Sequence, residues 1–169
     1  MVYSIPFICT LDTKLRAFQH KILLRYLPTN ILLNKMKVAE SDMCCFCGDE
    51  VETLLHLFCN CDLVRPFWQE LNFWCQNNVE TRVKTTQLNI ILGIVSRDPS
   101  FEIQNLIILL AKYHIFQAKL NNTRPNFNIF KKMLKKTYLV EFHIALNRDL
   151  IQKNLDKWRN LTMVEVEAW

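Results

Sequence analysis

The chain has 169 residues, half of them hydrophobic, so it is long enough for one domain or two small ones and can bury a sizeable core. Two glycines and five prolines are too few for a turn-rich β architecture and favour long helices. A net charge of +5 indicates an anionic partner, and an odd count of seven cysteines argues against a secreted disulfide scaffold.

The first predicted element is an amphipathic helix within residues 10–27. Its start can be capped by Thr10 or Asp12, and Pro28 ends it. A second, short helix is predicted within residues 28–36. The apolar face of the first helix is predicted from steps of three and four residues, at Leu11, Leu15, Phe18, Ile22 and Tyr26.

A cysteine cluster follows in residues 44–61, which hold five of the seven cysteines. Two cysteines separated by two residues can bind one metal ion, because the intervening turn brings both sulfurs to the same side. Cys44 and Cys47 have this spacing, and Gly48 suits the turn. Only one residue separates Cys45 from Cys47, so their sulfurs should diverge, and we expect Cys45 to lie outside the site.

His56 and a later cysteine would complete a tetrahedral set of four ligands. Residues 51–58 can form one or two helical turns that present His56. Cys59 shares a helix face with His56, whereas Cys61 lies just past the helix, where the chain can curve back. We favour Cys61, with Cys59 as the alternative. The pattern is then C-x2-C-x8-H-x4-C, which predicts a zinc knuckle.

Three other interpretations of the cluster are weaker. Buried cysteines without a metal are common singly, but not at this spacing and density. A catalytic zinc needs an open position for water, and a closed set of three cysteines and one histidine leaves none. A cysteine nucleophile with a histidine base would lack an obvious acid to orient it. The sequence therefore predicts a structural Zn²⁺ ion.

The remaining elements are also predicted as helices. One lies within residues 63–76, with an inward face of Phe67, Trp68, Leu71 and Trp74. We expect residues 88–94 to be a tight connector rather than a buried strand, because they contain Gly93. A central helix, roughly 100–121, should begin after a capping Asp98 and Pro99. The last helix is long and places its apolar side chains inward, at Phe127, Phe130, Leu134, Tyr138 and Phe142.

These elements give a mainly all-α fold, a helical domain with an inserted CCHC zinc knuckle. We divide it into basic amphipathic helices (1–43), the knuckle (44–61) and a helical C-terminal region (62–169), forming one compact unit. Residues 1–11 lack the basic region of a signal peptide, and the most apolar run, 105–116, is too short to cross a bilayer. An intracellular, reducing location is therefore expected, in the cytoplasm or the nucleus, with no membrane partner.

Two stretches of the sequence resemble the zinc-binding C-terminal region of reverse transcriptases from non-LTR (LINE-type) retrotransposons. They are FQHKILLRYLPTNILLNKM (18–36) and CCFCGDEVETLLHLFCNCDLVRPFW (44–68). The shared features are a basic leucine-rich helix ending in LPTN, the C-x2-C-G start, the ETLLHLF core and the aromatic FW after the last cysteine. The later stretches are similar to vertebrate members, notably from fish. On this family pattern the zinc ligands fall on Cys44, Cys47, His56 and Cys61.

The resemblance implies binding rather than catalysis. The family's endonuclease and polymerase precede this region on one long polypeptide. Polymerase chemistry needs paired acidic residues that hold two metal ions, and no Asp-Asp pair occurs here. We therefore expect a non-enzymatic C-terminal fragment without a small-molecule substrate. In the family, the region is implied to bind template RNA and to support target-primed reverse transcription.

The charge map is compatible with RNA as a partner. Residues 1–40 carry six Lys/Arg against two Asp/Glu, and residues 123–169 carry nine against five, whereas 41–80 carry one against seven. The knuckle acids Asp49, Glu50 and Glu52 argue against phosphate contact on that face. Phe46, at the knuckle tip, is a candidate for base stacking. The candidate phosphate-binding residues are Lys14, Lys21, Arg25, Lys35, Lys37, Lys131, Lys132, Lys135 and Lys136.

Two alternatives stay open. The chain can instead be a protein-interaction module that docks onto the reverse transcriptase core, in which case its basic faces are merely solvated. A large exposed apolar patch would favour that function. It can also be a remnant of a broken element without a selected function.

Overall fold

The structure is a computed structural model that describes residues 2–79, 83, 85–159 and 161. Its regular elements within these residues are helical, and the pairings Met43–Val51 and Val79–Leu161 are isolated β-bridges. The predicted all-α class is therefore confirmed. The elements are η1 (Val2–Ser4), α1 (Ile5–Cys9), α2 (Thr13–Leu23), α3 (Asn30–Lys35), η2 (His56–Asn60), α4 (Arg65–Asn78), α5 (Gln87–Leu92), α6 (Phe101–Leu120), α7 (Phe127–Asn147) and α8 (Ile151–Trp158).

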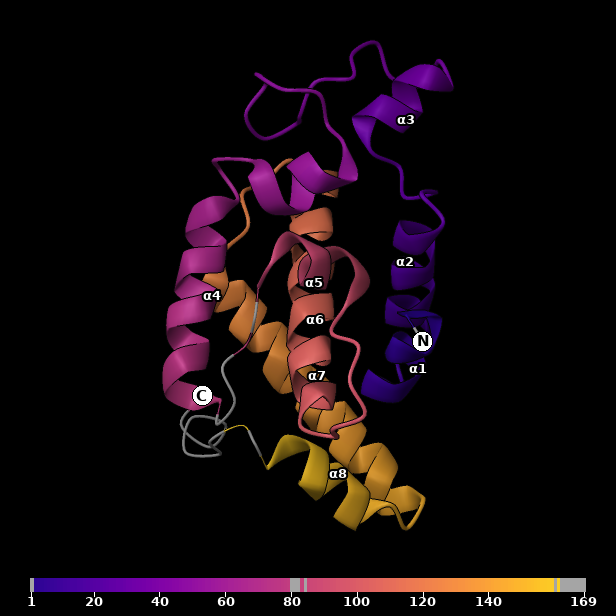
Figure 1. Ribbon diagram of the computed structural model, residues 1–169, viewed down its shortest axis with the longest axis vertical. Helices are drawn as coiled ribbons and strands as arrows, with labels where there is room; N and C mark the ends of the chain where they lie inside the picture. Colours follow the sequence, from indigo (N-terminus) through magenta and orange to yellow (C-terminus); the bar gives the residue numbers. More distant parts are fainter. Residues whose placement is uncertain (1, 80–82, 84, 160, 162–169) are drawn as a thin grey trace.

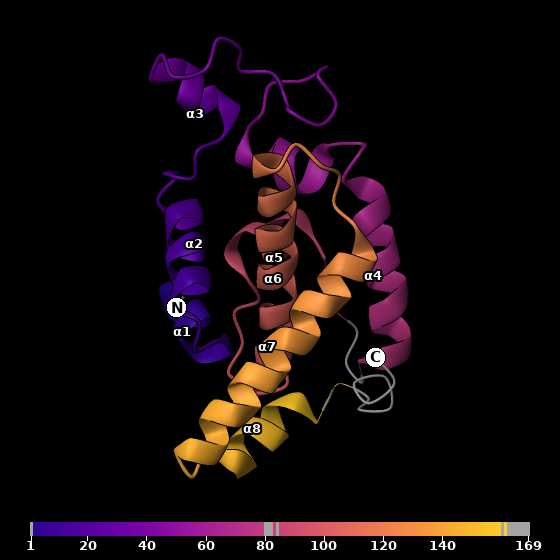
Figure 2. The same cartoon turned by 180° about the vertical axis from the view of Figure 1, so that it is seen from behind.

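Helix α6 is the centre of the fold. In Figure 1, α5 lies in front of it, and α1 and α2 lie on one flank and α4 on the other. Figure 2, the view from behind, shows α7 crossing α6 on the side opposite α5. Its side chains are buried on nearly every side, as the apolar composition of 100–121 predicts, and Leu109 and Leu110 are among them. None of the described helices is long and apolar enough to cross a membrane.

Helix α2 supplies one wall of the core. Leu15, Phe18 and Ile22 are buried, as predicted, and Asp12 caps the helix by accepting a hydrogen bond from the backbone N–H of Lys14. The prediction was wrong for Leu11 and Tyr26, which are both exposed. The helical part is shorter than the apolar pattern, so these two residues lie before and after it and point elsewhere.

Helices α4 and α7 form a second wall. Phe67, Trp68, Leu71 and Trp74 of α4 are all buried, as their helical spacing predicts. The rings of Phe67 and Phe130, in α7, meet edge to face, with centroids 5.7 Å apart. Edge-to-face pairs of this kind stabilise a core beyond the area they bury.

Two predictions about the second half of the chain were wrong. Residues 88–94 were expected to be a tight connector, but most of them belong to the short helix α5, which is capped by Thr86 and ended by Gly93, whose φ is +86°. The last long helix is followed by a separate helix, α8. Glu141 of α7 holds α8 in place, because its carboxylate accepts hydrogen bonds from Lys157 Nζ at 2.6 Å and from Trp158 Nε1 at 3.0 Å.

A lysine lies in the centre of the core without a carboxylate partner among the described residues. Lys112 of α6 is 1 % exposed, and its Nζ donates hydrogen bonds to Gln19 Oε1 and to the carbonyl oxygen of Ile91. Burial lowers the pKa of Lys112 from an ordinary value near 10.5 to about 7. The charged form is therefore disfavoured in the folded protein.

This pKa shift predicts a specific pH dependence. Between pH 7 and 10.5 the unfolded chain binds a proton at Lys112 that the folded chain does not, so raising the pH stabilises the folded state. The free energy of unfolding of the wild type should rise across this window relative to that of Lys112→Met. Urea denaturation of both proteins at pH 6.5, 8 and 9.5 measures it. Lys21→Met, at an exposed site on α2, is the control and should parallel the wild type. If the free energy of unfolding of Lys112→Met changed with pH in parallel with that of the wild type, the result would contradict the inference that burial neutralises Lys112.

Candidate metal centre

A small hairpin carries the first two cysteines of the cluster. Its arms meet at the Met43–Val51 bridge, and the backbone N–H of Cys44 donates to the carbonyl oxygen of Glu50 at 2.7 Å. At the tip, Gly48 has φ +75° and its N–H donates to the carbonyl oxygen of Cys44 at 2.9 Å. This left-handed conformation suits glycine. The turn thus brings Cys44 and Cys47 to one side, as their spacing predicts.

Four side chains converge beside this turn. The Sγ atoms of Cys44, Cys47 and Cys61 and one ring nitrogen of His56 all lie within 4.8 Å of one another. The Sγ atoms of Cys44 and Cys61 are 3.9 Å apart, and Cys47 Sγ is 3.3 Å from His56 Nε2. Tetrahedral zinc with ordinary bond lengths requires separations of about 3.8 Å and about 3.6 Å for such pairs. The four residues therefore fit a zinc ion closely.

The turn η2 explains why Cys61 joins the set. His56 stands at the start of this wide helical turn, and the backbone N–H of Cys61 closes it by donating to the carbonyl oxygen of His56 at 2.9 Å. The chain becomes extended at Cys61, and its side chain is fully buried. Cys59 is half-buried and belongs to neither candidate metal cluster in the described part of the chain. The geometry thus brings the sulfur of Cys61, not that of Cys59, to the site.

Cys45 belongs to a second and weaker cluster, with Cys44 and Glu52. The Cys45 side chain is exposed, and its backbone N–H donates to Glu52 Oε2 at 3.0 Å. The Glu52 carboxylate already holds Lys119 and the backbone N–H of Asn30. A metal there would compete with these partners for the same oxygens, so this cluster fits a metal less well.

Glu50 orients the histidine, a role that the sequence did not reveal. Its Oε2 lies 3.0 Å from His56 Nδ1, while His56 Nε2 faces Cys47. A hydrogen bond from Nδ1–H to the carboxylate fixes the ring and leaves Nε2 free to bind a metal. Metal-bound histidines commonly have such a carboxylate partner, which strengthens the nitrogen as a ligand. In the sequence, the sign of this role is a glutamate six residues before the histidine.

The ligand sulfurs differ in how readily they lose a proton. The pKa of Cys44 is lowered to about 4, mainly by a hydrogen bond from the Cys45 side chain and further by the backbone amides of Cys47 and Phe46. Burial raises the pKa of Cys61 to about 12. Zinc binds thiolates, so an ion bound here would release a proton from Cys61.

The sequence grouped Glu52 with Asp49 and Glu50 as acids of the knuckle face, but Glu52 does not lie on the surface. Its side chain is fully buried and forms an ion pair with Lys119 near the end of α6. It also accepts a hydrogen bond from the backbone N–H of Asn30 at 2.8 Å, and Asn30 Nδ2 donates to the carbonyl oxygen of Met43 at 2.7 Å. Glu52 therefore fastens the metal hairpin to α3 and to α6.

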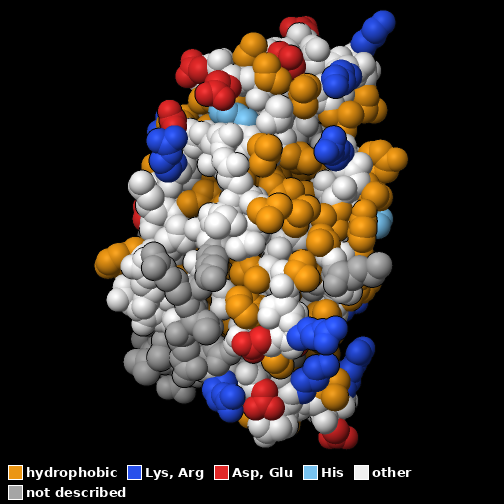
Figure 3. Space-filling view, viewed as in Figure 1, with side chains coloured by type: hydrophobic (Ala, Val, Ile, Leu, Met, Phe, Trp, Pro, Cys, Tyr) orange, Lys and Arg blue, Asp and Glu red, His pale blue; other side chains and the backbone are white. Residues whose placement is uncertain are grey.

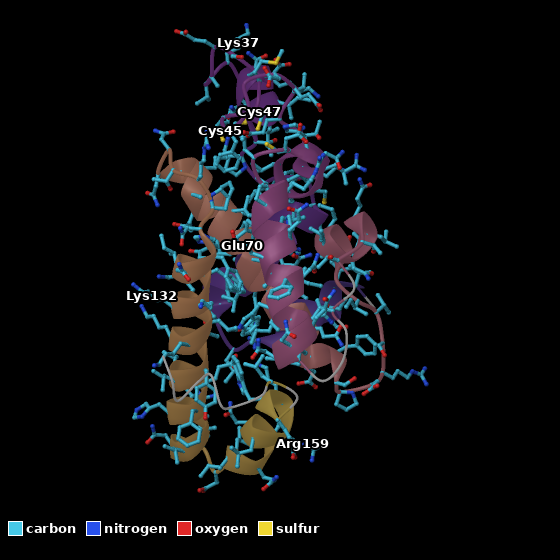
Figure 4. The ribbon with its side chains drawn as sticks, turned by 90° about the vertical axis from the view of Figure 1, so that its left-hand side faces the viewer. Lys37, Cys45, Cys47, Glu70, Lys132 and Arg159 are labelled. Atoms are coloured by element: carbon cyan, nitrogen blue, oxygen red, sulfur yellow. The ribbon has the colours of Figure 1, made fainter. Side chains whose placement is uncertain are left out.

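The candidate phosphate-binding residues fall into two groups. Lys14, Lys21 and Arg25 are exposed on α2 and just after it, and Lys35 and Lys37 are exposed at the end of α3. The second group lies on α7, where Lys132 and Lys136 are exposed and Lys131 and Lys135 are half-buried. In Figure 4, Lys37 points away from one end of the molecule and Lys132 points outward from the side of α7. Helix α6 separates α2 from α7 (Figures 1 and 2), so the structure does not bring the two groups together.

Phe46 is less available for stacking than its position suggests. It lies at the hairpin tip, but its side chain is half-buried and packs against the hydrophobic core. Its backbone N–H lies 3.4 Å from Cys44 Sγ and donates to that sulfur. The residue thus helps to shape the metal site, and only part of its ring can meet a base.

Comparison with known proteins agrees with this geometry. Residues 3–68 match the family described as zinc-binding in reverse transcriptase. A search of curated proteins found no match. The match begins before α1, ends within α4 and includes all four candidate ligands. The family is defined by zinc binding, not by polymerase catalysis. Residues 3–68 are therefore similar to the zinc-binding regions associated with reverse transcriptases.

Proposed function

We propose that this chain is a non-catalytic zinc-binding region of a LINE-type reverse transcriptase, with relatives in fish-like vertebrate elements, and that it binds template RNA in support of target-primed reverse transcription. Zinc holds the hairpin through Cys44, Cys47, His56 and Cys61. The observation that carries the proposal is the convergence of these four ligand atoms within 4.8 Å, inside the region that matches the family.

The charge distribution supports RNA as the ligand. Two separate basic surfaces, one on α2 and α3 and one on α7, flank a segment with one Lys/Arg and seven Asp/Glu in residues 41–80. Lysine and arginine neutralise phosphates irrespective of base sequence, so binding should show little sequence preference. Helices hold these cations at fixed spacing, which suits a structured or single-stranded RNA backbone.

Zinc contributes to this function indirectly. The hairpin packs on α3 through Glu52 and Asn30, and α3 ends at Lys35. A metal ion at the cluster would fix the hairpin and, through it, the orientation of Lys37, the exposed basic residue that follows α3. When bound, zinc would act as a structural centre with all four positions taken by protein ligands.

The salt dependence of RNA binding tests the proposal. If about four phosphates are neutralised on a single strand, the slope of log affinity against log salt should be near −3, at roughly −0.7 per phosphate. Changing both Lys132 and Lys136 to Gln should weaken binding and flatten the slope by about 1.4. Fluorescence anisotropy with a labelled single-stranded RNA at several salt concentrations provides the measurement.

A charge-matched control distinguishes the effect of a specific binding surface on α7 from the effect of lowering the net charge of the protein. Arg148 and Lys153 are also exposed, near the end of α7 and on α8. Changing both to Gln removes the same charge and should leave the slope nearly unchanged. Negligible RNA affinity of the zinc-loaded protein at physiological salt would refute RNA binding, and equal losses in both double variants would refute α7 as its surface.

A further inference from the structure

An open apolar groove of about 800 Å³ lies between α2, α3, α5 and the segment that leads into η2. Ile22 and Leu27 form its floor, Leu32 belongs to α3, Leu54 and Leu55 precede η2, and Leu88 belongs to α5. Figure 3 shows hydrophobic side chains gathered on this face, over the region where α5 faces α2 and α3. The zinc site lies next to the groove but does not line it.

The groove leaves apolar side chains exposed to water. Leu88 is 66 % exposed, Leu55 is 46 % exposed, and helix α3 buries none of its residues completely. Exposed apolar surface of this extent, concentrated along one groove, is typical of a binding site rather than of ordinary scattered exposure. Because the rim as well as the floor is apolar, an occupant must cover the rim too. A helix lying along the groove does this, whereas a small ligand inside it would leave the rim in water.

The charges around the groove are of one sign. Arg25 and Lys35 line it, and its other described lining residues are apolar or uncharged. Both side chains are exposed, and neither takes part in an ion pair within the described chain. Cations that flank an apolar groove favour an occupant with acidic residues beside an apolar face, and they disfavour a basic one.

We propose that this groove binds an amphipathic helix of a partner protein, whose apolar face fills the groove and whose flanking Asp or Glu residues pair with Arg25 and Lys35. This inference does not depend on RNA binding. It assigns Arg25 and Lys35 to a protein partner and leaves Lys14, Lys21, Lys37 and the lysines of α7 for nucleic acid.

A selection experiment identifies the preferred occupant. Phage that display random 16-residue peptides are selected on the zinc-loaded full chain. We expect the enriched peptides to carry apolar residues at helical spacing, i, i+3 or i+4 and i+7, with an excess of Asp and Glu. A synthetic copy of the most enriched peptide is then titrated by fluorescence anisotropy against the wild type and variants. Enrichment of basic peptides, or of peptides without helical periodicity, would overturn the proposal.

Matched variants locate the binding. Leu88→Glu should lower the affinity for the peptide at least tenfold. Phe73→Glu should change this affinity less than twofold, because Phe73 is a similarly exposed apolar residue (71 %) on α4, away from the groove. The double change Arg25→Glu with Lys35→Glu should also weaken binding at least tenfold, and Lys132→Glu with Lys136→Glu should not. Both groove variants alter exposed side chains, so the fold should persist, and thermal unfolding checks it.

Other occupants give distinct results. If sedimentation shows that the wild type self-associates and that Leu88→Glu does not, the groove binds a second copy of the chain. Loss of RNA binding in Leu88→Glu, with no effect on the peptide, would assign it to nucleic acid. Either result overturns the proposal. Failure of RNA binding with peptide binding intact would reject only the proposed RNA function.

Discussion

Replacement of Cys47 by serine is expected to abolish stoichiometric zinc binding, and replacement of Cys45 by serine is expected to preserve it. Cys47 Sγ lies 3.3 Å from His56 Nε2 within the four-residue cluster, whereas the side chain of Cys45 is exposed and outside it. A serine hydroxyl keeps its proton at neutral pH and does not replace a thiolate ligand. Metal analysis after desalting should give one zinc per chain for the wild type and Cys45→Ser, and none for Cys47→Ser.

Cys59→Ser provides a second control, because Cys59 lies two residues from Cys61 but outside the cluster. It should retain the zinc, while Cys61→Ser should lose it. Loss of zinc from Cys59→Ser together with retention in Cys61→Ser would show that the fourth ligand has been assigned wrongly. Glu50→Gln should keep the metal but bind it roughly 10–100-fold more weakly, as is usual when the partner of a ligating histidine is changed.

Removal of zinc should unfold the hairpin and spare the centre of the fold. Structural zinc contributes roughly 10–16 kcal/mol of apparent binding free energy in small zinc modules, much of which orders the surrounding loop. Residues 43–61 contain little regular structure of their own, whereas α6 is buried by helices on several sides. With a chelator, amide exchange should accelerate in residues 43–61 while circular dichroism retains most of its helical signal. Loss of the whole helical signal would contradict this separation.

Local patterns in the sequence predicted the parts of the fold that local physics determines. Phe18, Trp68 and Leu110 recur at helical spacing with their neighbours, and the structure buries all three. The convergence of Cys44 and Cys47 follows from a two-residue turn with a glycine after it. Cys61 follows from the end of a short helical turn. Each of these inferences needs only a few neighbouring residues.

The features that the sequence did not reveal depend on distant partners. Residues 88–94 look like a connector because they contain Gly93, and six helical residues are too few to show a periodic pattern. Contacts with α6 and α2 nevertheless stabilise α5. Glu52 and Glu141 look like solvated acids, because their partners Lys119 and Lys157 are 67 and 16 residues away. No local pattern predicts that a carboxylate will meet a lysine over such distances. The burial of both glutamates could be learned only from the fold.

Breaking the buried ion pair between Glu52 and Lys119 should therefore be among the most damaging single changes outside the metal ligands. The Glu52 side chain is fully buried and that of Lys119 is 7 % exposed. Lys119→Met leaves a buried carboxylate with hydrogen bonds from the backbone N–H groups of Asn30 and Cys45 but without its countercharge. Loss of one partner from a buried pair typically destabilises a protein by about 3–5 kcal/mol. Urea denaturation of the zinc-loaded variant measures the effect.

The surface pair between Arg65 and Asp62 provides the matched control, because both of its side chains are mostly exposed. Arg65→Met should change the free energy of unfolding by less than about 1 kcal/mol, since solvent screens such pairs. The double variant Glu52→Gln with Lys119→Met removes both buried charges and should recover part of the stability lost in Lys119→Met alone. If the double variant is as unstable as the sum of both single variants, the two side chains act independently and the pair does not hold the hairpin to α6. Recovery would instead show that two residues 67 positions apart are coupled directly, so that the pair ties the metal hairpin to the central helix.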